Sequence, residues 1–354
     1  MSLGPVMLDL EGLQLTGDEG EILCDPRVGG VILFSRNYHD PVQLERLVRE
    51  IHTLRDPKLL VAVDHEGGRV QRFRTDFTPL PPASAFGAIY DEAPSRGRHL
   101  AAVCGWLAAS ELRAVGVDFS FSPVLDLRSA KSDVIGERAF HASVDGVVNL
   151  ATAYINGMKR AGMAAVGKHF PGHGSVRGDS HVVVPEDDRD LDTLRGADLG
   201  VFERMIPHGL PALMPAHVVY KNVDDRPAGF SSYWLRKVLR EHLNFSGAIF
   251  SDDLMMAGAS SAGGIVERGT AALEAGCDML LVCNDREAAV KLLDAVPEKA
   301  DPVRSARLAR MHGLHEVSRS ALLKSDEYHQ AVAEISALNP APELDLGFDT
   351  PAPP

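Results

Sequence analysis

Eight short runs of apolar and β-branched residues recur along the chain, and segments with a helical period separate them. The runs lie at 4–10, 28–35, 59–68, 115–127, 164–172, 212–220, 247–256 and 277–284. This alternation is typical of βα units around a parallel sheet. Because eight strands are enough to close a barrel, the pattern predicts an α/β fold, a (β/α)8 TIM barrel in one domain. An open doubly wound sheet remains the alternative, since periodicity does not distinguish a closed sheet from an open one.

The segments between the runs predict helices, and only the link between the first two runs is too short for a long one. In the segment 41–55, apolar residues recur at spacings of mostly three and four, and Pro41 suits a first helical turn. After about residue 300 a charged helical stretch leads into a proline-rich end. We therefore expect a catalytic barrel domain over 1–335 and a disordered tail over 336–354. The predicted helices are 41–55, 97–115, 144–162, 191–206, 232–243, 264–275 and 286–294.

Polar residues gather at the carboxyl ends of the apolar runs. In a (β/α)8 barrel this end of the strands forms the active face. A purely structural protein has no need of so many polar strand ends, and the pattern indicates an enzyme or a binding protein. The residues are Asp9, Asp64 with His65 and Glu66, Asp126, Lys168 with His169, His217, Asp252 with Asp253, and Asn284.

Composition and charge narrow the choice of partner and compartment. The 354 residues carry 49 acidic and 36 basic side chains, a formal net charge of −13, and this field repels nucleic acid. We expect no membrane partner, because no window holds eighteen uninterrupted apolar residues. The start of the chain lacks the features of a signal peptide, which favours a cytoplasmic location. The four cysteines show no CxxC spacing, and we expect reduced thiols.

The sequence "KHFPGHGSVRGDSH", 168–181, is the most informative stretch. Its glycines and proline preclude a regular helix and predict a mobile loop after a strand. Asp179 and His181 are two apart, so in an extended chain their side chains share one side and form an acid/base dyad. A metal site is the rival interpretation, because His169 and His173 are four apart. The intervening proline and glycine deny them a shared helix face, and we expect no metal and no cofactor.

Two carboxylates and three arginines complete the candidate chemistry. In "FSDDLMM" the strand alternation lets only one of Asp252 and Asp253 face the barrel interior, and a carboxylate there suits nucleophilic attack on a sugar carbon. Asp253 suits a helix N-cap. In "DHEGGRVQRF", Asp64 can accept hydrogen bonds from vicinal hydroxyls. Arg69 and Arg72 in the same stretch can make charge-assisted contacts. Arg138 in "DVIGERAF" suggests a further substrate contact.

The motifs "DHEGGRVQR", "VIGERAF", "KHFPGHGSVRGDSH", "MPAHVVY" and "FSDDLMM" together resemble the family 3 glycoside hydrolases, above all their single-domain bacterial branch of cytoplasmic β-N-acetylglucosaminidases. The resemblance covers about residues 4–290 and implies an exo-acting, retaining enzyme without a cofactor. It implies Asp252 as nucleophile and His181, assisted by Asp179, as acid and base. The sugar-binding positions that it implies are Asp64, Arg72, Arg138, Lys168 and His169.

The substrate that the resemblance implies is a small molecule of cell-wall recycling, an N-acetylglucosaminyl-anhydro-muropeptide. A β-glucosidase or a glycoside phosphorylase of the same family is an alternative, since sequence does not display a pocket for the acetamido group. From other classes, a non-catalytic sugar-binding barrel and a metal-dependent hydrolase are the alternatives. An intact Asp252 with Asp179 and His181 argues against a protein that only binds sugar.

Overall fold

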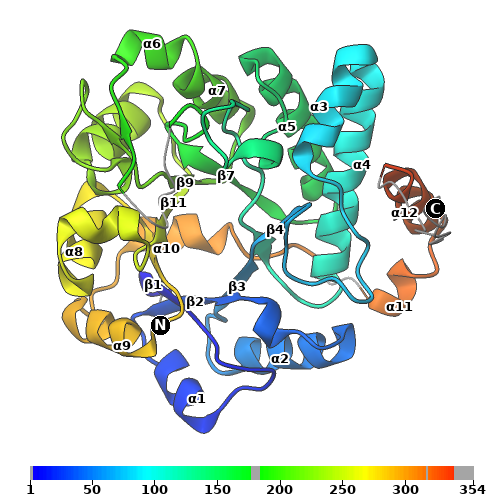
Figure 1. Ribbon diagram of the computed structural model, residues 1–354. Coiled ribbons are helices and arrows are strands. Elements are labelled where there is room, and N and C mark those ends of the chain that lie inside the picture. Colours follow the sequence, from blue (N-terminus) through cyan, green and yellow to red (C-terminus); the bar gives the residue numbers. More distant parts are fainter. Residues whose placement is uncertain (1–2, 177–183, 316–317, 339–354) are drawn as a thin grey trace, which may run out of the picture.

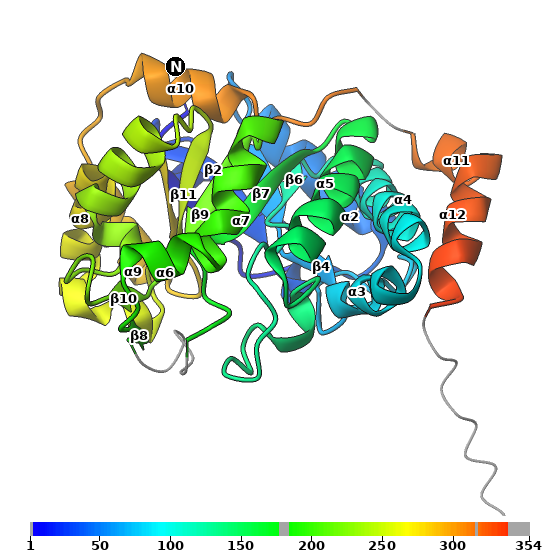
Figure 2. The same ribbon diagram turned by 90° about the horizontal axis from the view of Figure 1, so that it is seen from above.

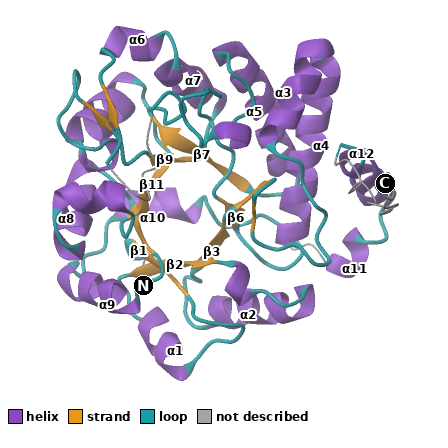
Figure 3. Cartoon of the chain, in the orientation of Figure 1, coloured by secondary structure: helices purple, strands orange, loops and turns teal. Residues whose placement is uncertain are grey.

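A closed barrel of eight parallel strands forms the centre of the molecule (Figure 1, Figure 3). The computed structural model describes residues 3–176, 184–315 and 318–338. Strand β1 pairs with both β2 and β12, through Val6 with Val28 and with Leu280, so the sheet has no open edge. The barrel is confirmed and the doubly wound sheet is excluded. Its strands are β1 (Val6–Asp9), β2 (Val28–Leu33), β3 (Leu60–Val63), β6 (Phe119–Ser120), β7 (Ala164–Phe170), β9 (Ala212–Pro215), β11 (Ala248–Asp253) and β12 (Met279–Val282).

Each of the eight predicted runs contains one barrel strand, although several strands are shorter than their runs. The run 115–127 contributes only β6, because Pro123 has no N–H to continue the ladder. An isolated bridge between Val124 and Lys168 extends the pairing towards β7. Two small sheets lie outside the barrel: the hairpin of β4 (His65–Gly67) with β5 (Val70–Gln71), and β8 (Glu186–Asp187) beside β10 (Val219–Tyr220).

Helices surround the barrel largely where the periodicity predicts them. The predicted helix 191–206 is divided at Ala197, whose backbone is not helical, and the predicted helix 232–243 has π-helical hydrogen bonding. Helix α3 was not predicted, because its apolar residues do not form a clear stripe. The helices are α1 (Gly17–Leu23), α2 (Pro41–Thr53), α3 (Ala83–Glu92), α4 (Pro94–Arg113), α5 (Val144–Arg160), α6 (Leu191–Arg195), α7 (Asp198–Met205), the π-helix Tyr233–His242, α8 (Ile265–Ala275) and α9 (Arg286–Ala295).

The barrel interior is a packed core with a cavity above it. The rings of Phe119 and Phe250 lie 5.2 Å apart although β6 and β11 are not neighbours in the sheet. Their contact therefore crosses the interior. Phe121 packs on both, with centroids 5.2 Å and 5.4 Å away, and its other side lines the cavity at the carboxyl ends of the strands. Aromatic packing thus closes the barrel below the site.

The described part of the chain after residue 300 contains three further helices. Helix α10 (Pro302–Ala309) lies across the amino ends of the strands, on the side opposite β8 and β10 (Figure 2). Helices α11 (Arg319–Leu322) and α12 (Asp326–Ser336) pack beside α4, where the Tyr328 hydroxyl donates to Glu111 over 2.8 Å. The predicted tail falls mostly on 339–354, outside the described residues, and stays a prediction. Within the described ranges no helix combines the length and apolarity that crossing a membrane requires.

Candidate active site

A cavity of about 280 Å³ opens at the carboxyl ends of the barrel strands. Six of the eight residues singled out from the sequence line it: Asp64, Arg72, Arg138, Lys168, His169 and Asp252. They come from several strands and the loops that follow them, with Lys168 and His169 both on β7, and closure of the barrel brings them together. Side chains that were not assigned to the site also line the cavity, among them Phe34, Glu66, Val134, His173, Met214, Asp253, Cys283 and Asn284.

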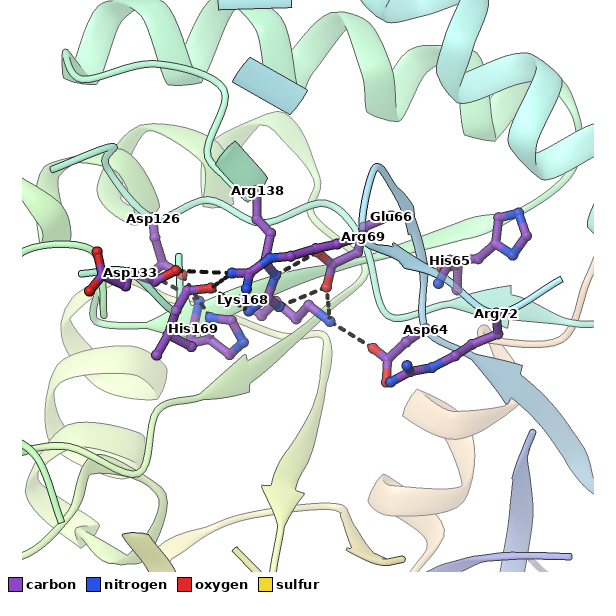
Figure 4. A network of polar contacts seen from close by, with 12 residues as sticks. Asp64, His65, Glu66, Arg69, Arg72, Asp126, Asp133, Arg138, Lys168 and His169 are labelled. Carbon is purple, nitrogen blue, oxygen red and sulfur yellow. Dashed lines mark hydrogen bonds and ion pairs between the residues drawn. The ribbon is translucent and has the colours of Figure 1, made fainter. Parts of the chain in front are cut away.

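Lys168, at the end of β7, lies at the centre of a polar network (Figure 4). Its Nζ is 2.8 Å from Asp64 Oδ1 and 2.7 Å from Glu66 Oε1. Burial disfavours the ammonium, but the two carboxylates outweigh burial and raise the pKa of Lys168. The side chain is therefore a buried, charged donor held in one position.

Arg138 and Glu66 form a bidentate ion pair beside Lys168. Arg138 Nε and Nη2 each donate to a carboxylate oxygen of Glu66 over 2.8 Å, and Nη1 donates to the Val134 carbonyl. Burial opposes ionisation of Glu66, yet Arg138 and Lys168 hold its pKa far below the usual range. Glu66 thus fixes the orientation of both cations at the cavity wall.

Asp64 and Arg72 meet at the other side of the network. Arg72 Nη2 is 3.7 Å from Asp64 Oδ2, and the guanidinium lies 5.5 Å from the ring centre of Phe34. One oxygen of Asp64 is bound to Lys168 and the other faces Arg72 more loosely. A ligand hydroxyl can therefore bridge Asp64 and Arg72 without breaking the shorter contact.

Asp126 holds the histidine that follows Lys168. Its Oδ2 is 2.7 Å from His169 Nδ1, and its Oδ1 accepts from the backbone N–H of His173 over 2.7 Å. Asp126 is fully buried; burial opposes its ionisation, but His169 and His173 lower its pKa. A carboxylate on Nδ1 places the proton there and leaves Nε2 of His169 as the nitrogen that meets a ligand.

Asp252, near the end of β11, presents an ionised carboxylate. Its Oδ1 accepts from the backbone N–H of Asp253 over 2.8 Å. Burial would raise the pKa of Asp252, but the neighbouring His217 and His169 lower it. His217 is itself buried, stacks on Phe230 at 5.3 Å and contacts the Asp253 carbonyl at 3.1 Å. The carboxylate is thus available as a nucleophile at neutral pH.

One expectation for Asp253 was wrong. The residue lines the cavity beside Asp252. It caps a turn rather than a helix, since its carboxyl accepts from the N–H groups of Met255 at 3.0 Å and Cys283 at 3.1 Å. Burial raises the pKa of Asp253 to about 7, which sets it apart from Asp252.

The predicted dyad of Asp179 and His181 lies outside the described residues. The chain on either side of it is held by one buried residue, Asp198 of α7. Asp198 accepts from Ser175 Oγ at 3.0 Å and from Arg189 Nη1 at 2.6 Å. Both flanks of the segment are therefore fixed to the same side chain, close to the cavity wall at His173.

The described ranges contain no group of three or more His, Cys, Asp or Glu side chains arranged to hold a metal ion. His169 and His173, the pair that the rival interpretation invoked, have ring centres 6.1 Å apart at an interplanar angle of 69°. Asp126 contacts the ring of the first and the backbone of the second. Asp126 thus holds both residues in place through hydrogen bonds, a role that requires no metal ion.

Sequence reasoning placed Glu66 and Asp126 at polar strand ends but assigned neither of them a role in the site. Glu66 is separated from Arg138 by 72 positions, and Asp126 from His169 by 43, so no local spacing reveals either pair. The signal for Asp126 was its place at the end of an apolar run. The signal for Glu66 was its spacing of two from Asp64, which places both carboxylates on one side of an extended chain.

A barrel with ionisable side chains from several strand ends converging on one cavity defines an enzyme of the (β/α)8 class. The model of the glycosyl hydrolase family 3 N terminal domain matches residues 7–311. The chain belongs to this family and is a glycoside hydrolase.

Curated relatives support the assignment along nearly the whole chain. A beta-hexosaminidase of Thioalkalivibrio sulfidiphilus is 59% identical over 349 residues, which cover 98% of this chain and 99% of the relative. One of Thiobacillus denitrificans is 56% identical, with 99% and 98% covered. The crystal structure of NagZ from Neisseria gonorrhoeae in complex with N-trifluoroacetyl-D-glucosamine has a TM-score of 0.92 and 45% identity, covering 96% of this chain and 99% of that one.

Proposed function

We propose that the protein is an exo-acting, retaining β-N-acetylglucosaminidase. Its substrate would be the terminal β-1,4-linked N-acetylglucosamine of anhydro-muropeptides in cytoplasmic cell-wall recycling. The observation that carries the proposal is the cavity itself. A closed floor and a volume of about 280 Å³ suit one sugar residue, which favours removal of a terminal unit over cleavage within a chain.

Asp252 is the proposed nucleophile. In the first step its carboxylate attacks the anomeric carbon, while protonated His181 gives its proton to the leaving oxygen. A covalent glycosyl ester forms on Asp252 and the aglycone departs. In the second step His181, now neutral, takes a proton from water, and the water oxygen displaces the carboxylate. The two inversions retain the configuration at the anomeric carbon.

The charged network supplies the sugar contacts in this proposal. Asp64 accepts from ring hydroxyls, Lys168 donates to them, and His169 meets the sugar through Nε2. Arg72 and Arg138 complete the pocket, one beside Asp64 and one beside Glu66. These donors and acceptors are held by ion pairs before the sugar enters, so little reorganisation opposes binding.

The names of the relatives support the choice of sugar. The matched relatives are called beta-hexosaminidases, and the solved NagZ structure reported above is a complex with N-trifluoroacetyl-D-glucosamine, an N-acylated glucosamine. The same cavity residues also fit a β-glucoside, because none of the contacts described above requires an acetamido group. The comparison of the two sugars is therefore the decisive one for specificity.

The configuration of the first-formed product tests the mechanism. Hydrolysis of an aryl β-N-acetylglucosaminide is followed by proton NMR within the time that mutarotation takes. A retaining enzyme releases the β-anomer first, and the α-anomer then appears slowly. Immediate release of the α-anomer would contradict a covalent intermediate on Asp252.

A further inference from the structure

A second cavity, of about 220 Å³, lies at the end of the barrel opposite the catalytic cavity. It is formed by α10, the end of α8, the π-helix and the residues just before β12. The two cavities share no lining residue. Four arginines and two aspartates line the second one: Arg236, Arg240, Arg304, Arg307, Asp278 and Asp301.

Two of the four arginines have a structural partner. Arg240 Nη2 is 2.9 Å from Asp278 Oδ2, and Arg307 Nη1 is 3.0 Å from Asp278 Oδ1. Arg240 also donates to the carbonyls of Phe245 and Gly247. Burial, despite the attraction of Asp278, lowers the pKa of Arg240 to about 10. One carboxylate therefore serves two guanidinium groups, and positive charge is left over at this wall.

The other two arginines lack a close carboxylate. Arg236 donates through Nε and Nη2 to the Glu274 carbonyl at the end of α8. Arg304 Nη2 is 4.0 Å from Asp301, whose Oδ1 already caps α10. The terminal Nη groups of Arg304 make no hydrogen bond to the residues that the structure describes. They are the donors that a ligand in the cavity can use.

We propose that this cavity binds a small oxyanion of the phosphate class with two or more negative charges, such as inorganic phosphate, pyrophosphate or a phosphate monoester. Four guanidinium groups face two carboxylates, and the two positive charges in excess match a dianion. Arginine forks suit the tetrahedral oxygens, which accept several charge-assisted hydrogen bonds at once. The whole chain has a net charge of −13, so the excess of positive charge in this cavity is not part of a generally basic surface.

The ligand would bind without competing with the sugar. Because Asp278 immediately precedes β12, and the chain after β12 reaches Cys283 and Asn284 in the catalytic cavity, one strand connects the two sites. An anion that tightens the arginine cluster would stabilise the fold at this end of the barrel. Binding itself is the claim to be tested, and it does not depend on the proposed hydrolase activity.

The test is isothermal titration of the purified full chain with pyrophosphate and with inorganic phosphate, at an ionic strength held constant with sodium chloride. The same titration is made with Arg304→Gln, with Arg236→Gln and with a control, Arg46→Gln, an exposed arginine of α2. Thermal unfolding checks that each variant is folded. We expect saturable binding by the wild type and the control, and a loss of affinity of about tenfold or more in the two cavity variants.

Three results would overturn the proposal. One is the absence of saturable binding by the wild type for both anions. Another is equal affinity in Arg304→Gln, Arg236→Gln and the wild type, which would place the anion elsewhere, including in the catalytic cavity beside Lys168. The third is an equal loss in Arg46→Gln, which would mean a response to net charge alone. Because Arg236 is exposed, its variant keeps the test decisive if Arg304→Gln fails to fold.

Discussion

Replacement of Asp126 by asparagine isolates the hydrogen bond that orients His169. The carboxylate accepts from His169 Nδ1 at 2.7 Å and from the His173 backbone at 2.7 Å. Asparagine has the same shape, so its oxygen can still accept from the His173 N–H. Its amide nitrogen then faces His169 Nδ1 and donates to it. The proton of the imidazole moves to Nε2, and the nitrogen that meets the sugar changes from acceptor to donor.

The size of the effect follows from the burial of the pair. Asp126 is fully buried and His169 nearly so, with 7% exposed. A hydrogen bond to a charged group in such a place contributes about 1.5–3 kcal/mol. If the bond acts on the transition state, kcat/KM falls about tenfold to a hundredfold.

A matched control exists at the other end of the barrel. Asp118 is also fully buried and contacts a histidine, with His52 Nε2 at 3.0 Å, but it does not line the catalytic cavity. Asp118→Asn should lower stability and leave kcat/KM per folded molecule unchanged. The assay is hydrolysis of an aryl β-N-acetylglucosaminide by wild type and both variants, with thermal unfolding alongside. A folded Asp126→Asn within twofold of the wild type in kcat/KM would refute the reasoning.

Two further predictions concern Arg138 and Asp118. Arg138→Ala removes a cavity donor and half of the Glu66 ion pair, so KM should rise about tenfold or more while kcat falls less; an unchanged KM would contradict this. Burial would raise the pKa of Asp118, but His312, 3.6 Å away, and the hydrogen bond to His52 hold it well below the usual range. Its contribution to stability is therefore present above the unfolded-state pKa of about 3.9 and is lost at lower pH. The Tm difference between wild type and Asp118→Asn should shrink below about pH 4, and a constant difference would argue against an ionised Asp118.

The barrel could be predicted because parallel strands are buried on both faces and therefore appear as continuous apolar runs. Periodicity alone did not distinguish this closed sheet from an open one, since closure depends on the pairing of Val6 with Leu280, which are far apart in the chain. The break within the predicted helix 191–206 also escaped prediction. The residues there favour a helix, but Asp198 begins a new one with its side chain buried against Arg189 and Ser175.

The site could be predicted as far as strand ends and motifs indicate it. Lys168, His169 and Asp252 were predicted at the active face because they end apolar runs, and all three line the cavity. What the sequence did not show is which charges neutralise one another. Glu66 joins Lys168 to Arg138 only after three separate segments meet at the cavity.

Hydrolysis by wild type and Asp252→Ala tests the central claim most directly. Both proteins are given an aryl β-N-acetylglucosaminide and the matching aryl β-glucoside, with and without a chelator. We expect the wild type to release the aryl group from the N-acetyl substrate whether or not the chelator is present, and to act much more slowly on the glucoside. We expect folded Asp252→Ala to be inactive. Activity that survives the substitution would contradict Asp252 as nucleophile, and a wild type inactive on both sugars would contradict the proposed activity.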